Sequence, residues 1–222
     1  MVDDGRTARG PGSRFSHPEP TGLPEPTGLP EPAGDGPDEA GRRAGPGART
    51  WSRRAEGDRR SRLRATLEVA GGECVIVLDD RRIPGSRATI SMIAVAPAGV
   101  FVIDARHHKG LVHTKRPGAF DRLDPPELHV GRKNCTSSLD ALGRQVEIVR
   151  ATLDGTPWGS EVTVTAMLCL TRAEWGLASS TRIRDVWVGW PRLMAGTVCS
   201  PGIMNLPSVR EVARVIDTRL PA

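Results

Sequence analysis

A carboxylate and a cation stand two residues apart at the end of a strongly apolar segment. Residues 100–103 (Val-Phe-Val-Ile) lead directly into Asp104, Ala105 and Arg106. If the segment is a strand, Asp104 and Arg106 point to the same face, because strand side chains alternate between the two faces of a sheet. An acid and a cation held side by side suit a metal ion bound next to a phosphate group. A strand end that simply enters solvent gives the same pattern, so the pair alone leaves both interpretations open.

A predicted β-hairpin positions these two residues. Its strands cover residues 89–95 and 100–105, which are rich in β-branched and apolar side chains, and Pro97 and Gly99 supply the turn. Residues 81–86 and 116–134 are predicted mostly as loop. Further strands are predicted over residues 74–78, 111–114, 162–170 and 183–187, and helices over residues 52–70, 137–153 and 209–220. This order predicts one α/β domain in which helices flank a mixed β-sheet.

The first 49 residues differ from the rest in composition. They hold 9 of the 19 Pro and 10 of the 25 Gly, and they repeat Glu-Pro-Thr-Gly-Leu-Pro at residues 19–24 and 25–30. A segment of this composition has too little apolar surface to offset the entropy lost on ordering. Residues 1–49 are therefore predicted to be a disordered tail. The folded domain is then expected over residues 50–222. A Pro-rich ligand for a protein partner is the alternative interpretation of the tail.

Charge and cysteine spacing exclude several classes of protein. Residues 50–222 carry 25 basic and 18 acidic side chains, which permits an anionic partner. No apolar run is long enough for a membrane span, and the N-terminus lacks the apolar stretch of a secretory signal. The four cysteines stand far apart without zinc-finger spacing, so a structural zinc site or a disulfide scaffold is not expected. These features predict a cytoplasmic protein with reduced thiols.

Two groups of basic residues could contact nucleic acid. Arg81, Arg82 and Arg87 flank a Pro-Gly turn, and Lys109 and Lys115 follow the hairpin. If the fold gathers them on one face, they would form a basic patch suited to a phosphate backbone, with an affinity that depends on salt. A scattered charged surface is the alternative.

The segment over residues 81–110 resembles the core of the nuclease-related domain (NERD) family. The similarity lies in the Arg-rich Pro-Gly-Ser loop, the Val-Phe-Val-Ile strand and the acid-x-cation motif that follows, and it extends to Ala-Glu-Gly-Asp at residues 55–58 and Arg-Gln-Val at residues 144–146. The resemblance covers about residues 52–220. It implies a restriction-endonuclease-like α/β fold in which carboxylates bind Mg²⁺ or Mn²⁺ beside a nucleic-acid phosphate. Carried over to this chain, Asp104 and Asp58 would be metal ligands, Arg106 a phosphate clamp and Gln145 a positioning residue.

Two positions depart from the family pattern. Ser91 stands where the first hairpin strand has a metal-binding Asp, and Arg106 stands where the family has Lys. A neutral hydroxyl is a poor ligand for a hard divalent cation, and arginine keeps its charge but does not give up its proton. The resemblance therefore implies a degenerate active site. We expect metal-dependent phosphodiester hydrolysis, or alternatively a catalytically inactive nucleic-acid-binding module, with protein interaction through the tail as a third hypothesis.

Overall fold

The computed structural model of the chain describes residues 46–116, 125–176 and 181–222, without the side chains of residues 46–56 and 59. Helix α1 (Pro46–Gly71) begins inside the predicted tail, the rest of which lies outside the described residues. The prediction that the tail is disordered, and the hypothesis that it binds a protein, therefore stay predictions.

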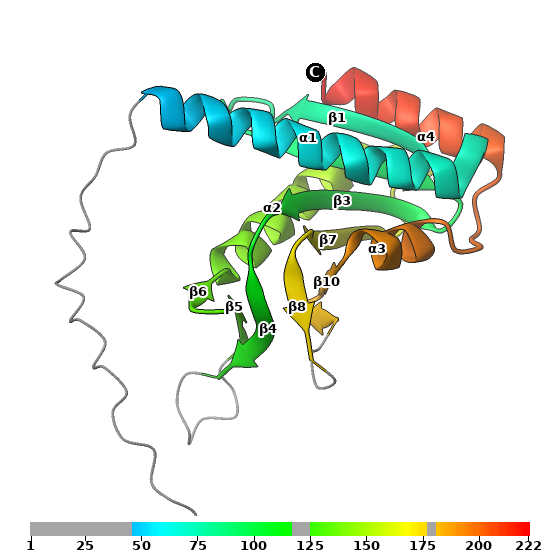
Figure 1. The fold of residues 1–222 in the computed structure, drawn as a ribbon. Helices are drawn as coiled ribbons and strands as arrows, with labels where there is room; N and C mark the ends of the chain where they lie inside the picture. Colours follow the sequence, from blue (N-terminus) through cyan, green and yellow to red (C-terminus); the bar gives the residue numbers. More distant parts are fainter. Residues whose placement is uncertain (1–45, 117–124, 177–180) are drawn as a thin grey trace, which may run out of the picture. The chain divides into compact units, whose positions relative to one another are not determined.

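A six-stranded mixed sheet forms the centre of the domain (Figure 1). Strands β1 to β3 form an antiparallel meander, β3, β7 and β10 run parallel, and β9 is antiparallel to β10. In spatial order the strands are β1 (Ile76–Arg82), β2 (Thr89–Ala96), β3 (Gly99–Arg106), β7 (Val164–Leu170), β10 (Val186–Gly189) and β9 (Arg182–Ile183). Because β1, β3, β7 and β10 run in the same direction, all four finish at one end of the sheet, which we call the carboxyl end.

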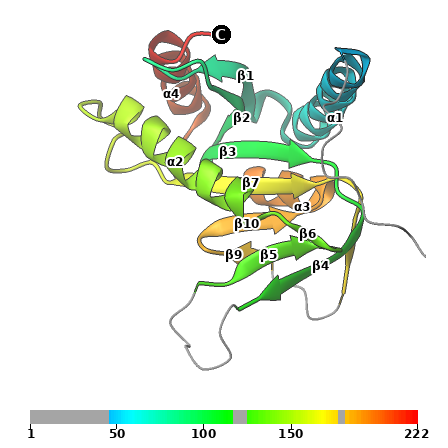
Figure 2. The ribbon, with the colours of Figure 1, turned by 90° about the vertical axis from the view of Figure 1, so that its left-hand side faces the viewer.

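Helices cover both faces of this sheet (Figure 2). Helix α1 and helix α3 (Pro191–Val198) pack on one face, where Leu63 and Leu67 of α1 meet Ile103 of β3 in a buried cluster. Helix α2 (Thr136–Leu153) and helix α4 (Leu206–Arg219) pack on the other face. A short 3₁₀ turn, η1 (Gly72–Cys74), links α1 to β1. The fold predicted from the sequence, a mixed sheet between layers of helices, is confirmed.

A second, four-stranded sheet continues from the carboxyl end of the first. It contains β6 (Lys133–Asn134), β5 (Glu127–Val130), β4 (Gly110–Lys115) and β8 (Ala173–Trp175), in that order. Strands β4 and β8 follow β3 and β7 along the chain and pair in parallel as they do. The predicted loop over residues 116–134 is therefore wrong for β5 and β6. These strands are too short to show a sequence pattern; β5 is stabilised by pairing with β4, and β6 by pairing with β5.

Several other predictions were correct or can now be refined. The hairpin, the strand at residues 111–114 and the helix at residues 137–153 are confirmed. Strand β1 extends to Arg82, so the loop predicted from residue 81 is shorter than expected, and α3 and β8 were not predicted. All four cysteines are free thiols. None of the helices in the described ranges is long and apolar enough to cross a lipid bilayer.

Candidate nucleic-acid interface

Asp104 and Arg106 form an ion pair at the carboxyl end of β3. The Arg106 Nε donates a hydrogen bond of 2.7 Å to the Asp104 Oδ2. Asp104 is 9% exposed, whereas 44% of the Arg106 side chain is exposed. The two residues share a face, as their spacing predicts, but the cation neutralises the carboxylate that the resemblance assigns to a metal.

On the side that faces the core, this ion pair is shielded from water. Asp104 alternates with Val102 toward the face that α2 covers, and Arg106 lies close enough to Cys135 for its charge to act on that thiol. Burial raises the pKa of Cys135, while the charges of Lys133 and Arg106 oppose the rise. For Cys169 on β7, burial and then the charge of Asp104 raise the pKa to about 12. Asp104 is thus a carboxylate set at the boundary between the core and solvent.

Ser91 and Asp104 lie at the open end of the hairpin. The pairing of Met92 with Ile103 is the last of the antiparallel ladder, and Ser91 and Asp104 are the next residues outward on the two strands. At the position where the family pattern has an acid on β2, this chain therefore has a hydroxyl group.

Asp58 belongs to a different part of the site. It lies on α1, on the other face of the sheet, and accepts a 2.9 Å ion-pair contact from Arg62 one turn along the helix. Both residues line a cavity of about 570 Å³ that also contacts His107 and Thr171, which follow β3 and β7. Asp104 is not among the residues that line it.

The side chains described do not fit a divalent metal ion. Within the described ranges, which exclude the side chain of Glu56, no three His, Cys, Asp or Glu residues come together in a group that could hold a metal. A hard cation such as Mg²⁺ takes several oxygen ligands and is usually bound through carboxylates. Here one Asp104 oxygen accepts from Arg106, and the neighbouring position is Ser91.

Gln145 is half-buried in the middle of α2. It stands ten residues beyond Cys135, the neighbour of Arg106, which corresponds to about 15 Å along the helix axis. No hydrogen bond in the described part of the chain links Gln145 to the ion pair, and its predicted positioning role stays a prediction.

Four exposed cations lie at the carboxyl end of the sheet. Arg82 ends β1, Arg87 lies in the loop before β2, Lys109 follows β3 and Arg172 follows β7. All four are exposed, and none forms an ion pair with a residue of the described part of the chain. We call these four residues the basic rim.

The other two predicted cations lie elsewhere. The Arg81 side chain is only 12% exposed, because it forms an ion pair with Asp217 of α4 and its Nε donates to the Asp79 carbonyl at 2.8 Å. Lys115 is exposed at the end of β4 in the second sheet. Arg81 therefore tethers β1 to α4, while Lys115 is separated from the basic rim by the length of β4.

Thr171 and Arg172 are two residues of the site that were not predicted from the sequence. The Thr171 amide and hydroxyl both donate to the Arg106 carbonyl, at 3.0 and 3.3 Å, which fixes the end of β7 against the end of β3. The available signal was a hydroxyl and a cation directly after a long apolar strand, the same kind of position as Asp104.

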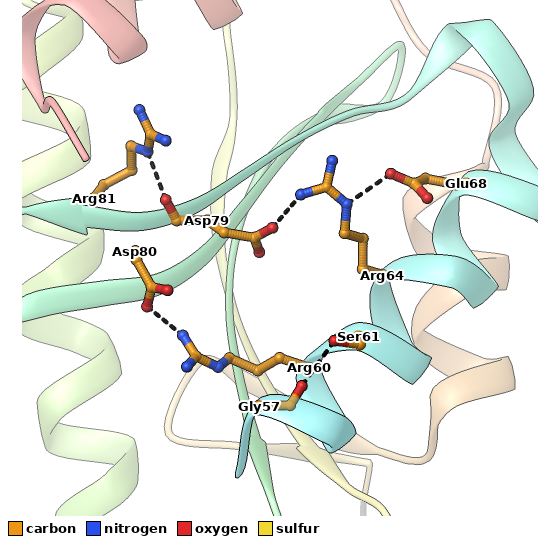
Figure 3. Close-up of polar contacts among 8 residues, drawn as sticks. All are labelled: Gly57, Arg60, Ser61, Arg64, Glu68, Asp79, Asp80 and Arg81. Carbon is orange, nitrogen blue, oxygen red and sulfur yellow. Dashed lines mark hydrogen bonds and ion pairs between the residues drawn. The ribbon is translucent and has the colours of Figure 1, made fainter. Parts of the chain in front are cut away.

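In contrast to the basic rim, the charged residues that join α1 to β1 are paired with one another (Figure 3). Arg60 and Arg64 reach from α1 to Asp80 and Asp79 on β1, and Arg64 also donates to Glu68 at 2.7 Å. Hydrogen bonds from Arg64 to Glu68 and Asp79 raise the pKa of its guanidinium. Every cation in this set has a carboxylate partner.

The α/β fold, the acid–cation motif at the end of β3 and the hairpin before it define a nuclease-like domain. A sequence model of the nuclease-related domain (NERD) matches residues 54–171, which is more than half of the chain. The chain therefore belongs to the nuclease-related domain family. No curated protein and no solved structure matches it.

Proposed function

We propose that this domain binds the phosphate backbone of nucleic acid through the basic rim, as a member of the nuclease-related family that needs no metal ion to bind. The observation that carries this proposal is the concentration, at one end of the sheet, of exposed cations that form no ion pair with any residue the structure describes. Lysine and arginine side chains that neutralise phosphates release condensed counterions, which provides most of the affinity of sequence-independent binding.

Neighbouring side chains support the same function. Arg106 is half-exposed beside the rim and keeps a cation where the family has Lys. Trp190, which follows β10 at the same end of the sheet, is 39% exposed. It packs edge-to-face against Trp175, with the two ring centroids 5.2 Å apart. An exposed indole offers a stacking surface to unpaired bases.

Phosphodiester hydrolysis with Mg²⁺ or Mn²⁺ is the competing proposal, and it rests on family membership and on the retained Asp104. The donor set argues against it, because Asp104 is already paired with Arg106 and has Ser91 as its neighbour. The two proposals differ in what metal removal does: hydrolysis requires the ion, whereas binding through cations does not.

The test incubates the full chain with plasmid and single-stranded DNA or RNA in Mg²⁺, Mn²⁺ or EDTA, and measures cleavage and binding in parallel. Asp104→Ala is the control for contaminating nucleases. We expect binding that weakens steeply with salt, is equal in EDTA and Mg²⁺, and is not accompanied by cleavage. Metal-dependent cleavage that disappears in Asp104→Ala would contradict the proposal and establish the hydrolytic function.

A further inference from the structure

The cavity beside the basic rim has a position and lining that the rim itself does not explain. It lies where α1 approaches the carboxyl ends of β3 and β7 and the start of α3. Its volume of about 570 Å³ is within the range of pockets that enclose a small organic ligand. It is lined by Asp58, Arg62, Leu63, Thr66, His107, Thr171, Arg172 and Pro191.

The lining combines cations with hydroxyl groups and an apolar wall. Arg172 is exposed and forms neither an ion pair nor a hydrogen bond with the residues that the structure describes. Arg62 enters from α1, oriented by its 2.9 Å contact with Asp58. Thr171 is held against the Arg106 carbonyl, and its Oγ1 also lies 3.4 Å from the His107 Nδ1. The Arg172 guanidinium beside the Thr171 hydroxyl supplies the charge-assisted donors that a phosphate group needs, whereas Arg62 is already paired with Asp58 in the same lining.

The size of the cavity favours the end of a nucleic-acid strand over its interior. An internal phosphodiester continues the chain on both sides, and a duplex is far wider than a pocket of this size. A terminal phosphate continues on one side only, so it can enter with its nucleotide. It also carries more negative charge than a phosphodiester, and this charge strengthens its contacts with cationic side chains. Pro191, which is partly exposed, offers an apolar surface to the sugar and base.

We propose that this cavity binds the terminal phosphate and the adjoining nucleotide of a single-stranded nucleic-acid end, while the following phosphates contact the basic rim. The assignment rests on the proposed function, because the rim provides the binding to which the cavity adds a preference for ends. Arg172 belongs to both, since it lines the cavity and is one of the rim residues. A 5′ or a 3′ phosphate presents the same group, and the experiment distinguishes them.

The test measures fluorescence anisotropy of the full chain with a short single-stranded oligonucleotide that carries a 5′ phosphate, a 3′ phosphate or two hydroxyl ends. We expect about tenfold tighter binding for one of the phosphorylated strands, as one charge-assisted hydrogen bond supplies. Arg172→Gln should reduce this preference to about twofold or less. Arg192→Gln is the matched control, because Arg192 is an exposed arginine next to Pro191 that does not line the cavity and should leave the preference unchanged.

The outcomes separate this proposal from the previous one. Equal affinity for all three strands, with salt-dependent binding retained, would overturn the cavity assignment and leave backbone binding by the rim standing. A preference that survives in Arg172→Gln would also overturn the assignment, because the phosphate would then bind elsewhere. Absence of binding to every oligonucleotide would overturn both proposals. Circular dichroism of each variant confirms that it is folded.

Discussion

The α1–β1 contact and the basic rim are both rich in basic residues but differ in what surrounds them. In the α1–β1 contact, Arg60 and Arg64 each have a carboxylate partner on β1. In the rim, Arg82 and Arg87 have no carboxylate partner among the residues that the structure describes. Arginines that are already paired contribute little to the binding of an external anion, because an acid already occupies the guanidinium. Under the proposed function, the position of the acids, rather than the number of basic residues, determines which part of this surface binds nucleic acid.

The largest expected effect comes from reversing charges in the rim. Arg82→Glu with Arg87→Glu should weaken nucleic-acid binding about 30-fold near physiological salt, because two phosphate contacts are lost and two negative charges are added. The same charge change on α4, Arg210→Glu with Arg214→Glu, removes arginines that already lie near Glu73 and Glu211. It should alter affinity far less. Anisotropy titrations of both variants check this, and equal losses would mean that only net charge matters.

The second prediction concerns the dry interior below the rim. The pKa of Cys169 is about 12 in the folded protein, against 9.0 for an ordinary cysteine. Below pH 9 the thiol is protonated in both states, so its contribution to stability is complete. Between about pH 9 and 12 the unfolded thiol loses its proton while the folded one keeps it, so the free energy of unfolding should fall by up to about 1.4 kcal/mol per pH unit.

Urea unfolding at several alkaline pH values measures this slope. Cys169→Ala should reduce the slope, leaving the contribution of Cys135 and Cys199, whose pKa values burial also raises. The chain has no tyrosine, so phenol ionisation does not interfere. An unchanged slope in Cys169→Ala would contradict a dry interior at this position.

The sequence predicted those features of the fold and site that depend on near neighbours. The β-branched and apolar side chains of β2 and β3 and the turn between them identified the hairpin, and the spacing of Asp104 and Arg106 put them on one face, where they form an ion pair. Strands β5 and β6 escaped detection because four and two residues carry no periodicity of their own. Strand β5 forms because β4 pairs with it, and β6 forms because β5 pairs with it.

Distant partners made the cations unpredictable. Arg81 and Arg82 are adjacent and chemically identical, yet Arg81 is paired with Asp217, which lies 136 residues further along the chain. In the same way, only the packing of α1 against the ends of β3 and β7 brings Asp58 to Thr171 rather than to Asp104. Such distinctions require the folded structure.

The third prediction converts a paired cation into an unpaired one. Asp104→Asn removes the charge that holds Arg106, whose side chain is 44% exposed at the rim. The freed guanidinium should raise affinity about fivefold, the contribution of one phosphate contact. Asp217→Asn is the matched control, because it releases Arg81 in a position where that side chain is only 12% exposed. We expect no change in affinity there, and a gain in both variants would show that acids weaken binding from any position.

The neighbouring arginines Arg81 and Arg82 provide the most direct test that unpaired cations at the carboxyl end of the sheet bind nucleic acid. The measurement is the affinity of the full chain for nucleic acid as a function of salt, in EDTA, for the wild type, Arg81→Gln and Arg82→Gln. Arg82→Gln should reduce the slope of log affinity against log salt by about 0.9 and affinity about fivefold, with unchanged stability. Arg81→Gln should keep the wild-type slope and lose about 1 kcal/mol of stability. Equal slopes in all three proteins, or a reduced slope in Arg81→Gln alone, would contradict the account.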